Sequence, residues 1–263
     1  MIAAAGALAV SALAKATLHR DLLQLAQAPL ADQALGKSLI FSGFVLAPTL
    51  ACVMLFRQTL ASSAWDVRAG SSLLGLGLAA GAGAHMVLVG LFWLGGYWQL
   101  RLEEIDLPTA AQSALWSAAV WLLVALGEEG LYRGYVLVRL SRAFAFWPSA
   151  IITSLWFGAG HLANPGESGV GVASTVLFGL VLAWSVRRTG SIWFAVGVHA
   201  AWNFLQSFVF GFNNSGGVSR VSLFDGRLDG PELVAGGAAG PEGSLLVLVP
   251  LLLLTALVAR RRG

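Results

Sequence analysis

Long apolar runs follow one another along this chain, separated by short polar or charged segments. A bilayer core about 30 Å thick requires about 20 apolar residues per helix. The runs that meet or approach this length are Ser38–Phe56, Ser72–Trp98, Leu107–Gly127, Pro148–Leu162, Val170–Val186, Ile192–Phe212 and Leu245–Ala259. Because an unpaired strand edge cannot lie in lipid, and no barrel alternation is visible, each run predicts a helix. The pattern therefore predicts an all-α, polytopic transmembrane bundle.

The amino-terminal segment has a different pattern. Met1–Ala14 is apolar but short, so it indicates either a first span or an uncleaved signal-like segment. The total is then seven or eight spans. We expect residues 1–37 to form a separate N-terminal segment and residues 38–263 to form one membrane domain.

One segment between two spans is amphipathic. Gly134–Phe146 carries Arg139 and Arg142 three residues apart among apolar side chains. This spacing predicts an amphipathic helix in the membrane interface, or a re-entrant element, in place of another full span.

Arginine placement indicates the orientation in the membrane. If the spans alternate, one side receives Arg57, Arg68, Arg139, Arg142, Arg187, Arg188 and Arg260 to Arg262. The acidic loop at 103–106 and the long Gly-rich loop at 213–243 fall on the opposite side. By the positive-inside rule the arginine side, with the C-terminus, is the cytoplasm. The short loops and the Gly, Ala and Leu content favour a bacterial plasma membrane.

Composition excludes several classes of function. Of the 263 residues, 57% are hydrophobic and 11% are charged, whereas a soluble domain carries about a quarter charged residues. The net charge of +3 is scattered between apolar runs, so no basic face could neutralise a row of phosphates, and nucleic acid is not an expected partner. The single cysteine, Cys52, forms no intrachain disulfide and is expected to be a small buried hydrophobe.

Two adjacent glutamates, Glu128 and Glu129, stand at the end of an apolar run. Ionisable groups at such a depth are costly and usually functional. Glu129 precedes Arg133 by four residues, the spacing of an intrahelical ion pair. Such a pair would neutralise one glutamate and leave Glu128 free to act.

Three further polar residues lie in or at the end of other predicted spans. His161 ends the fourth of these spans, and His199 and Asn203 share one helix face because they are four residues apart. His85 stands alone in a span rich in glycine and alanine, and we expect it to be a packing residue.

The chemistry of these residue types is specific. A carboxylate and an imidazole that converge on one water can deprotonate it for attack on a peptide carbonyl. The Asn203 amide and the His199 ring are donors suited to the oxyanion of a tetrahedral intermediate. Glu128, His161 and His199 also match a zinc site of the two-histidine, one-carboxylate type. The sequence leaves a metal-free glutamate mechanism and a zinc mechanism equally open.

In chain order, these residues resemble the three motifs of the CPBP family (CAAX protease and bacteriocin-processing), also called the ABI family. The motifs read Glu128-Glu129-x-x-x-Arg133, Phe157-x-x-x-His161 and His199-x-x-x-Asn203. The best-known branch of this family is the type II CAAX prenyl endopeptidase. The resemblance covers about residue 38 to the C-terminus.

The resemblance implies an all-helical intramembrane protease with a cavity open to the cytosolic side. It implies that Glu128 and His161 activate the hydrolytic water and that His199 and Asn203 stabilise the oxyanion. Glu129 and Arg133 would be the supporting pair, and Phe157 would pack one turn from His161.

The implied partner is a peptide or protein substrate, with or without a lipid group, of the CAAX or the bacteriocin-processing type. Two other functions remain as alternatives. One is a non-catalytic membrane scaffold or bacteriocin self-immunity partner, in which the polar residues only join helices. The other is a transporter or proton relay, which would require inverted repeats that the sequence does not show.

Overall fold

The structure is a computed structural model, and it describes residues 64–65, 70–164, 166–217 and 221–260. The predicted segments Met1–Ala14 and Ser38–Phe56, the domain boundary at residue 37, and Cys52 all lie outside these residues.

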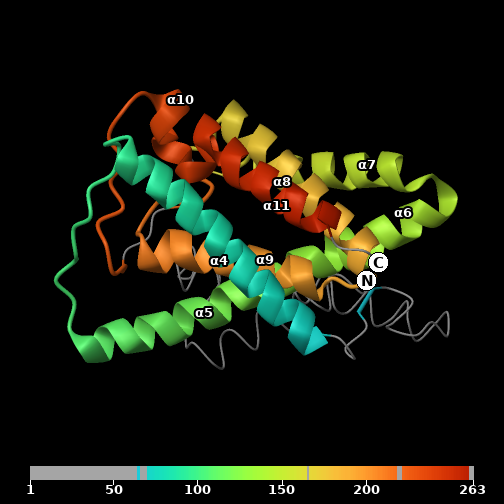
Figure 1. Cartoon of the computed structure of the whole chain (residues 1–263), viewed down its shortest axis with the longest axis horizontal. Helices are drawn as coiled ribbons and strands as arrows, with labels where there is room; N and C mark the ends of the chain where they lie inside the picture. Colours follow the sequence, from blue (N-terminus) through green and yellow to red (C-terminus); the bar gives the residue numbers. More distant parts are fainter. Residues whose placement is uncertain (1–63, 66–69, 165, 218–220, 261–263) are drawn as a thin grey trace.

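The described residues form a bundle of helices joined by short turns and one long loop (Figure 1). The longer helices are α4 (Gly70–Leu94), α5 (Leu107–Glu129), α7 (Phe146–Ala159), α8 (Gly169–Thr189), α9 (Trp193–Phe204) and α11 (Leu248–Arg260). The shorter helices are α6 (Leu137–Ala143), α10 (Glu232–Ala235), the π-helices η2 (Gly130–Val136) and η3 (Leu205–Val209), and the 3₁₀ turns η4 (Gly237–Ala239), η5 (Pro241–Gly243) and η6 (Leu245–Val247).

The predicted all-α fold is confirmed. Each apolar run predicted from residue 72 onward contains a helix, but two of the ends differ from those expected: the run that begins at Leu107 continues as helix to Ala143, and α9 ends at Phe204, where η3 follows. Within the described residues, three helical stretches are long and apolar enough to cross a membrane: Gly70–Leu94, Leu107–Ala143 and Gly169–Thr189. A shorter apolar helical stretch covers Leu245–Arg260.

The helix that carries the two glutamates is longer than its apolar run. It continues without a break through η2 and α6 as far as Ala143 and ends where Phe144 becomes extended. The segment predicted as a separate amphipathic element is therefore the continuation of the same helix. Its two faces do differ, since Leu137 is buried and Arg142 is exposed.

Local sequence explains where two of the helices start. Asp106 caps α5, because its carboxylate accepts hydrogen bonds from the backbone N–H (2.9 Å) and the hydroxyl (2.7 Å) of Thr109. Ser168 caps α8 in the same way through the N–H of Gly171, at 2.9 Å. Helix α8 ends at Thr189, and the next residue, Gly190, has a positive φ of 68° that favours glycine.

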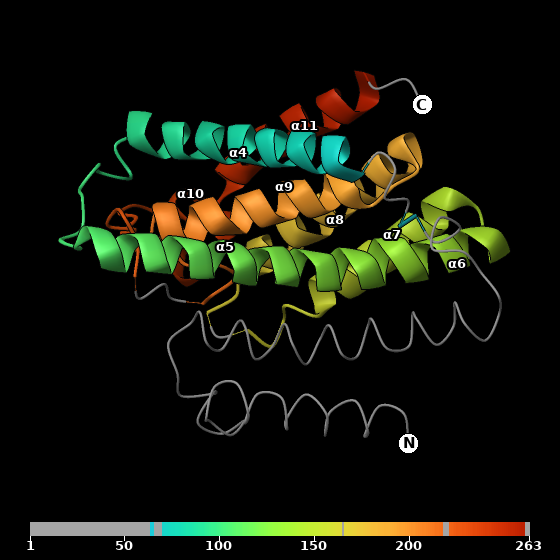
Figure 2. The same cartoon turned by 90° about the horizontal axis from the view of Figure 1, so that it is seen from below.

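Glycines let α4 and α9 pack backbone to backbone. A Cβ added at Gly77 or Gly81 would collide with carbonyl oxygens of α9, and one added at Gly197 would collide with α4. Small residues at a helix interface permit this close approach in membranes. Helix α9 also packs against α5 (Figure 2). It is therefore held between two helices, one of which carries the glutamates.

The two ends of the bundle differ in charge. The C-terminal ends of α8 and α11 and the whole of α6 lie at one end in both views, and these segments carry arginines (Figures 1 and 2). The opposite end is formed by the loop before α5 and the long loop after η3. Arg142, Arg187, Arg188 and Arg260 thus lie at one end, whereas Arg101 and Arg227 lie with the acidic loop residues at the other.

Candidate active site

The polar residues of the three motifs come from the end of α5, from η2, from the turn after α7 and from α9. The fully buried carboxylate of Glu129 joins the first and last of these elements. Its Oε1 accepts a hydrogen bond from Nη1 of Arg133 at 3.0 Å and lies 2.9 Å from Nδ1 of His199. Arg133 is fully buried as well. The ion pair predicted from the spacing of Glu129 and Arg133 is therefore present, and it extends to α9.

Glu128 has a different environment from its neighbour. Its side chain is 22% exposed, and its Oε2 lies 3.7 Å from Nε2 of His199. That distance is too long for a direct hydrogen bond. No ion pair joins Glu128 to His161, both of which the structure describes, although the sequence analysis expected these two to meet. The reason is helix packing, which places α9 against the end of α5 and so brings His199 to both glutamates.

Both motif histidines are oriented through Nδ1. Nδ1 of His199 faces the Glu129 carboxylate, and Nδ1 of His161 lies 2.8 Å from the carbonyl oxygen of Phe157. Carboxylate and carbonyl oxygens only accept hydrogen bonds, so Nδ1 of each ring carries the proton and donates it. Nε2 of each ring is then available for chemistry.

Phe157 is the apolar centre of the cluster. Its ring centroid lies 4.9 Å from that of His161 and 6.1 Å from that of His199, in both cases edge to face. The guanidinium carbon of Arg133 lies 4.3 Å from the same centroid, within cation–π range. Phe157 was expected to pack against His161; it also contacts two other motif residues.

Helix α8 makes room for the buried guanidinium. A Cβ added at Gly179 would lie 2.7 Å from Nη2 of Arg133 and 3.2 Å from the Ser154 side chain. A side chain at Gly179 would therefore displace Arg133, and α8 helps to position the Glu129–Arg133 pair although it carries no motif residue.

Asn203 lies one turn after His199 and has a partner that sequence reasoning missed. Its Oδ1 is 3.3 Å from Nδ2 of Asn214, and the same Nδ2 is 3.2 Å from Oγ of Ser207. The Asn-Ser-Gly sequence after residue 213 is typical of a tight turn. It gives no sign of which helix the turn approaches.

His85 lies outside this cluster. It is fully buried in α4, with its ring centroid 4.9 Å from that of Trp202 and 5.8 Å from that of Phe210. This aromatic packing agrees with the packing role expected from the sequence.

The zinc ligands predicted from the sequence are Glu128, His161 and His199. Among the described residues, no three His, Cys, Asp or Glu side chains gather into a group that could hold a metal ion. The Nδ1 bonds of both histidines are nevertheless of the kind that orient a ligand. Zinc at these three residues therefore stays a prediction.

A second buried carboxylate lies outside the motifs, in η5. Oε2 of Glu242 accepts a hydrogen bond of 2.6 Å from Nε2 of Gln206, and the backbone N–H of Ser215 also donates to this carboxylate. Burial raises the pKa of Glu242 from its usual 4.5 to about 7, and the negative charge of Glu167 adds to the rise.

This shift predicts a pH dependence of stability. Between about pH 4.5 and 7 the folded chain binds a proton at Glu242 that the unfolded chain has lost, so the free energy of unfolding falls as pH rises through that window. Glu242→Gln should remove this fall and be more stable than the wild type at pH 8, by roughly 3 kcal/mol at most. Thermal unfolding in detergent at pH 5 and pH 8 measures it, with the exposed Glu232→Gln as control. If the wild type and Glu242→Gln lost the same stability between pH 5 and pH 8, the loss would not come from the buried Glu242 carboxyl.

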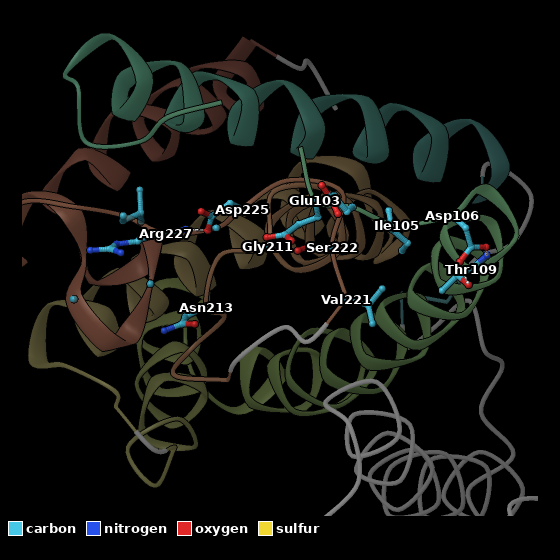
Figure 3. A pocket seen from close by; sticks show the side chains of 15 residues that line it. Glu103, Ile105, Asp106, Thr109, Gly211, Asn213, Val221, Ser222, Asp225 and Arg227 are labelled. Atoms are coloured by element: carbon cyan, nitrogen blue, oxygen red, sulfur yellow. Dashed lines mark hydrogen bonds between the residues drawn. The ribbon is translucent and has the colours of Figure 1, made fainter. Parts of the chain in front are cut away.

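A polar cavity of about 670 Å³ lies at the loop end of the bundle (Figure 3). Its acidic lining residues are Glu103, Glu104, Asp106 and Asp225. None of the motif residues lines it. Asn213 does, and the next residue, Asn214, contacts Asn203. Two adjacent loop residues thus connect the cavity wall with a motif residue.

Fold and site together define a class of protein: an integral membrane protein in which carboxylate, imidazole and guanidinium groups form a buried cluster between helices. Residues 110–205 match the family model described as type II CAAX prenyl endopeptidase Rce1-like. This match agrees with the family predicted from the three motifs, and all of the motif residues lie within the matched range. The family is one of CAAX-type intramembrane peptidases. Comparison with curated proteins and with solved structures gave no match.

Proposed function

We propose that this chain is an intramembrane endopeptidase in which Glu128 activates the water that hydrolyses a peptide bond near the membrane surface. The observation that carries the proposal is the contrast between the two glutamates. Glu129 is fully buried and bonded to Arg133 and His199, whereas Glu128 is partly exposed and receives no hydrogen bond from the described residues. A general base must contact water, and Glu128, unlike the fully buried Glu129, is exposed enough to do so.

The first chemical step uses the residues around Glu128. The carboxylate takes one proton from a water, and the water oxygen attacks the carbonyl carbon of the scissile peptide bond. Nε2 of His161 accepts the second hydrogen of the same water and so orients it. The product is a tetrahedral intermediate with negative charge on the former carbonyl oxygen.

The second step breaks the peptide bond. The Asn203 amide donates hydrogen bonds to the oxyanion. His199 donates from Nε2 when both of its ring nitrogens carry a proton, with Nδ1–H still held by Glu129. Collapse of the intermediate expels the amine, and the proton taken up by Glu128 passes to the leaving nitrogen. Water is consumed, and a carboxylic acid and an amine are formed; the acid then loses its remaining proton to solvent and becomes a carboxylate.

The proposed substrate is a peptide or protein segment at the bilayer surface, with or without a prenyl group, of the CAAX or bacteriocin-processing type. We further propose a bacterial plasma membrane location, with the arginine-bearing end and the C-terminus in the cytoplasm, on the basis of the arginine distribution.

The test is hydrolysis of fluorogenic peptides by the purified protein, with matched prenylated and unprenylated sequences. Cleavage that depends on Glu128 supports the proposal, and the ratio of rates between the two peptide sets identifies the substrate class. Parallel assays with a chelator, followed by added zinc, distinguish the two mechanisms: inhibition reversed by zinc would contradict the metal-free steps. If a folded protein cleaves no peptide of either set, the scaffold or self-immunity alternative is favoured.

A further inference from the structure

We propose that Asn214 is a positioning residue for Asn203: it fixes the Asn203 amide with its N–H groups available to the oxyanion. This inference rests on the proposed function. It adds to the site a residue that lies beyond the range matched by the family model, which ends at residue 205.

The hydrogen bonds of the Asn214 amide support this role. Nδ2 of Asn214 donates to Oδ1 of Asn203 (3.3 Å) and to Oγ of Ser207 (3.2 Å). Asn203 and Ser207 are one helical turn apart, so one amide group bridges both. Because Oδ1 of Asn203 is used as an acceptor, its own Nδ2 points the other way. A flipped Asn203 would place two donor groups against each other in a site that is 7% exposed, which costs free energy.

The turn that carries Asn214 is tight. Backbone hydrogen bonds of 2.8 Å run in both directions between Asn214 and Gly217. The two residues between them, Ser215 and Gly216, have positive φ values of 45° and 77°. This is the pattern of a two-residue hairpin turn of type I′, which allows little backbone freedom.

The turn is anchored on two sides. Nε2 of Gln206 donates to the carbonyl oxygen of Asn213 (2.7 Å) as well as to Glu242, and the N–H of Gly216 donates to the carbonyl oxygen of Ala239 (3.2 Å). The N–H of Ser215 donates to Glu242. Contacts from η3 and from the loop before α11 therefore hold Asn214 against α9.

The expected effect is on catalysis more than on binding. An aspartate at position 214 can only accept, so Asn203 would turn its N–H groups toward the new carboxylate and away from the oxyanion. Asn214→Asp should lower kcat by about a hundredfold, and Asn214→Ala by about tenfold, because alanine offers no competing acceptor. KM should stay within about twofold in both. In the neighbouring variant Asn213→Ala, the lost side-chain amide is one that donates a hydrogen bond to the Ala238 carbonyl oxygen, and this variant should retain wild-type kcat.

The test measures kcat and KM for these variants, alone and combined with Asn203→Ala, with thermal unfolding as a check on folding. Once Asn203 is removed, Asn214→Asp and Asn214→Ala should cause no further loss. Two results would overturn the positioning role. One is an equal fall in kcat in Asn214→Asp and Asn214→Ala together with a raised KM. The other is a fall in kcat that stays just as large when Asn203→Ala is also present. Failure of the proposed function gives a different result, because cleavage would then survive Glu128→Gln whatever occupies position 214.

Discussion

Glu128→Gln is expected to lower the rate constant of peptide hydrolysis by at least about a hundredfold and to leave the protein folded. Glutamine has nearly the same shape as glutamate, but its amide cannot accept the proton of the attacking water. Since Glu128 is 22% exposed and receives no hydrogen bond from the described residues, the change leaves no buried charge unpaired. Single-turnover hydrolysis at saturating enzyme measures the effect, and thermal unfolding in the same detergent should show no large shift.

The matched control is Glu104→Gln, an exposed carboxylate in the loop before α5, which should keep wild-type activity. Full hydrolysis by Glu128→Gln would show that another group is the base. A marked fall in stability without any cleavage by the wild type would instead favour the scaffold alternative, in which the polar cluster only joins helices.

Arg133→Met should have the largest effect on stability. Arg133 is the partner that neutralises Glu129, and both side chains are fully buried. Methionine preserves apolar volume beside Phe157 but leaves the carboxylate charged and without its cation. Breaking a buried pair in this way typically costs about 3–5 kcal/mol. Thermal or denaturant unfolding in detergent measures it, with the partly exposed Arg139→Met as control and an expected change under about 1 kcal/mol.

The double variant Arg133→Met with Glu129→Gln distinguishes the effect of the buried charges on stability from their effect on activity. Removal of both charges should restore most of the stability, because replacing a whole buried ion pair is often close to neutral. Activity should not return, since Nδ1 of His199 then faces an amide and not the carboxylate that orients the ring. If the double variant is as unstable as Arg133→Met, the cost does not come from the unpaired Glu129 charge.

The sequence predicted the fold well because its apolar runs are local signals. A run of about 20 apolar residues in lipid must be helical to satisfy its backbone hydrogen bonds, whatever its neighbours are. The prediction was less accurate at the end of the helix that carries the two glutamates. The change of pattern after Gly127 indicated a helix end, yet the helix continues to Ala143, because the π-helical turn at Gly130–Val136 keeps the backbone helical while Arg133 points inward.

The candidate site also has one part that the sequence predicts and one part that it does not. The Glu129–Arg133 pair follows from a spacing of four residues on one helix, so it could be predicted from the sequence, and the three motifs predicted the family. The contact of His199 with both glutamates depends on the packing of α9 against α5, and no local pattern in the sequence indicates which helices pack together.

By itself, the sequence determined the helices, the intrahelical ion pair and the set of residue types able to hydrolyse a peptide bond. Only the tertiary structure decided which histidine faces Glu129 and that the Asn214 amide donates a hydrogen bond to Asn203. The physical reason is range: helix formation and i,i+4 pairing depend on residues a few positions apart, whereas the partners of His199 and Asn203 are chosen by how separate helices and a hairpin turn pack.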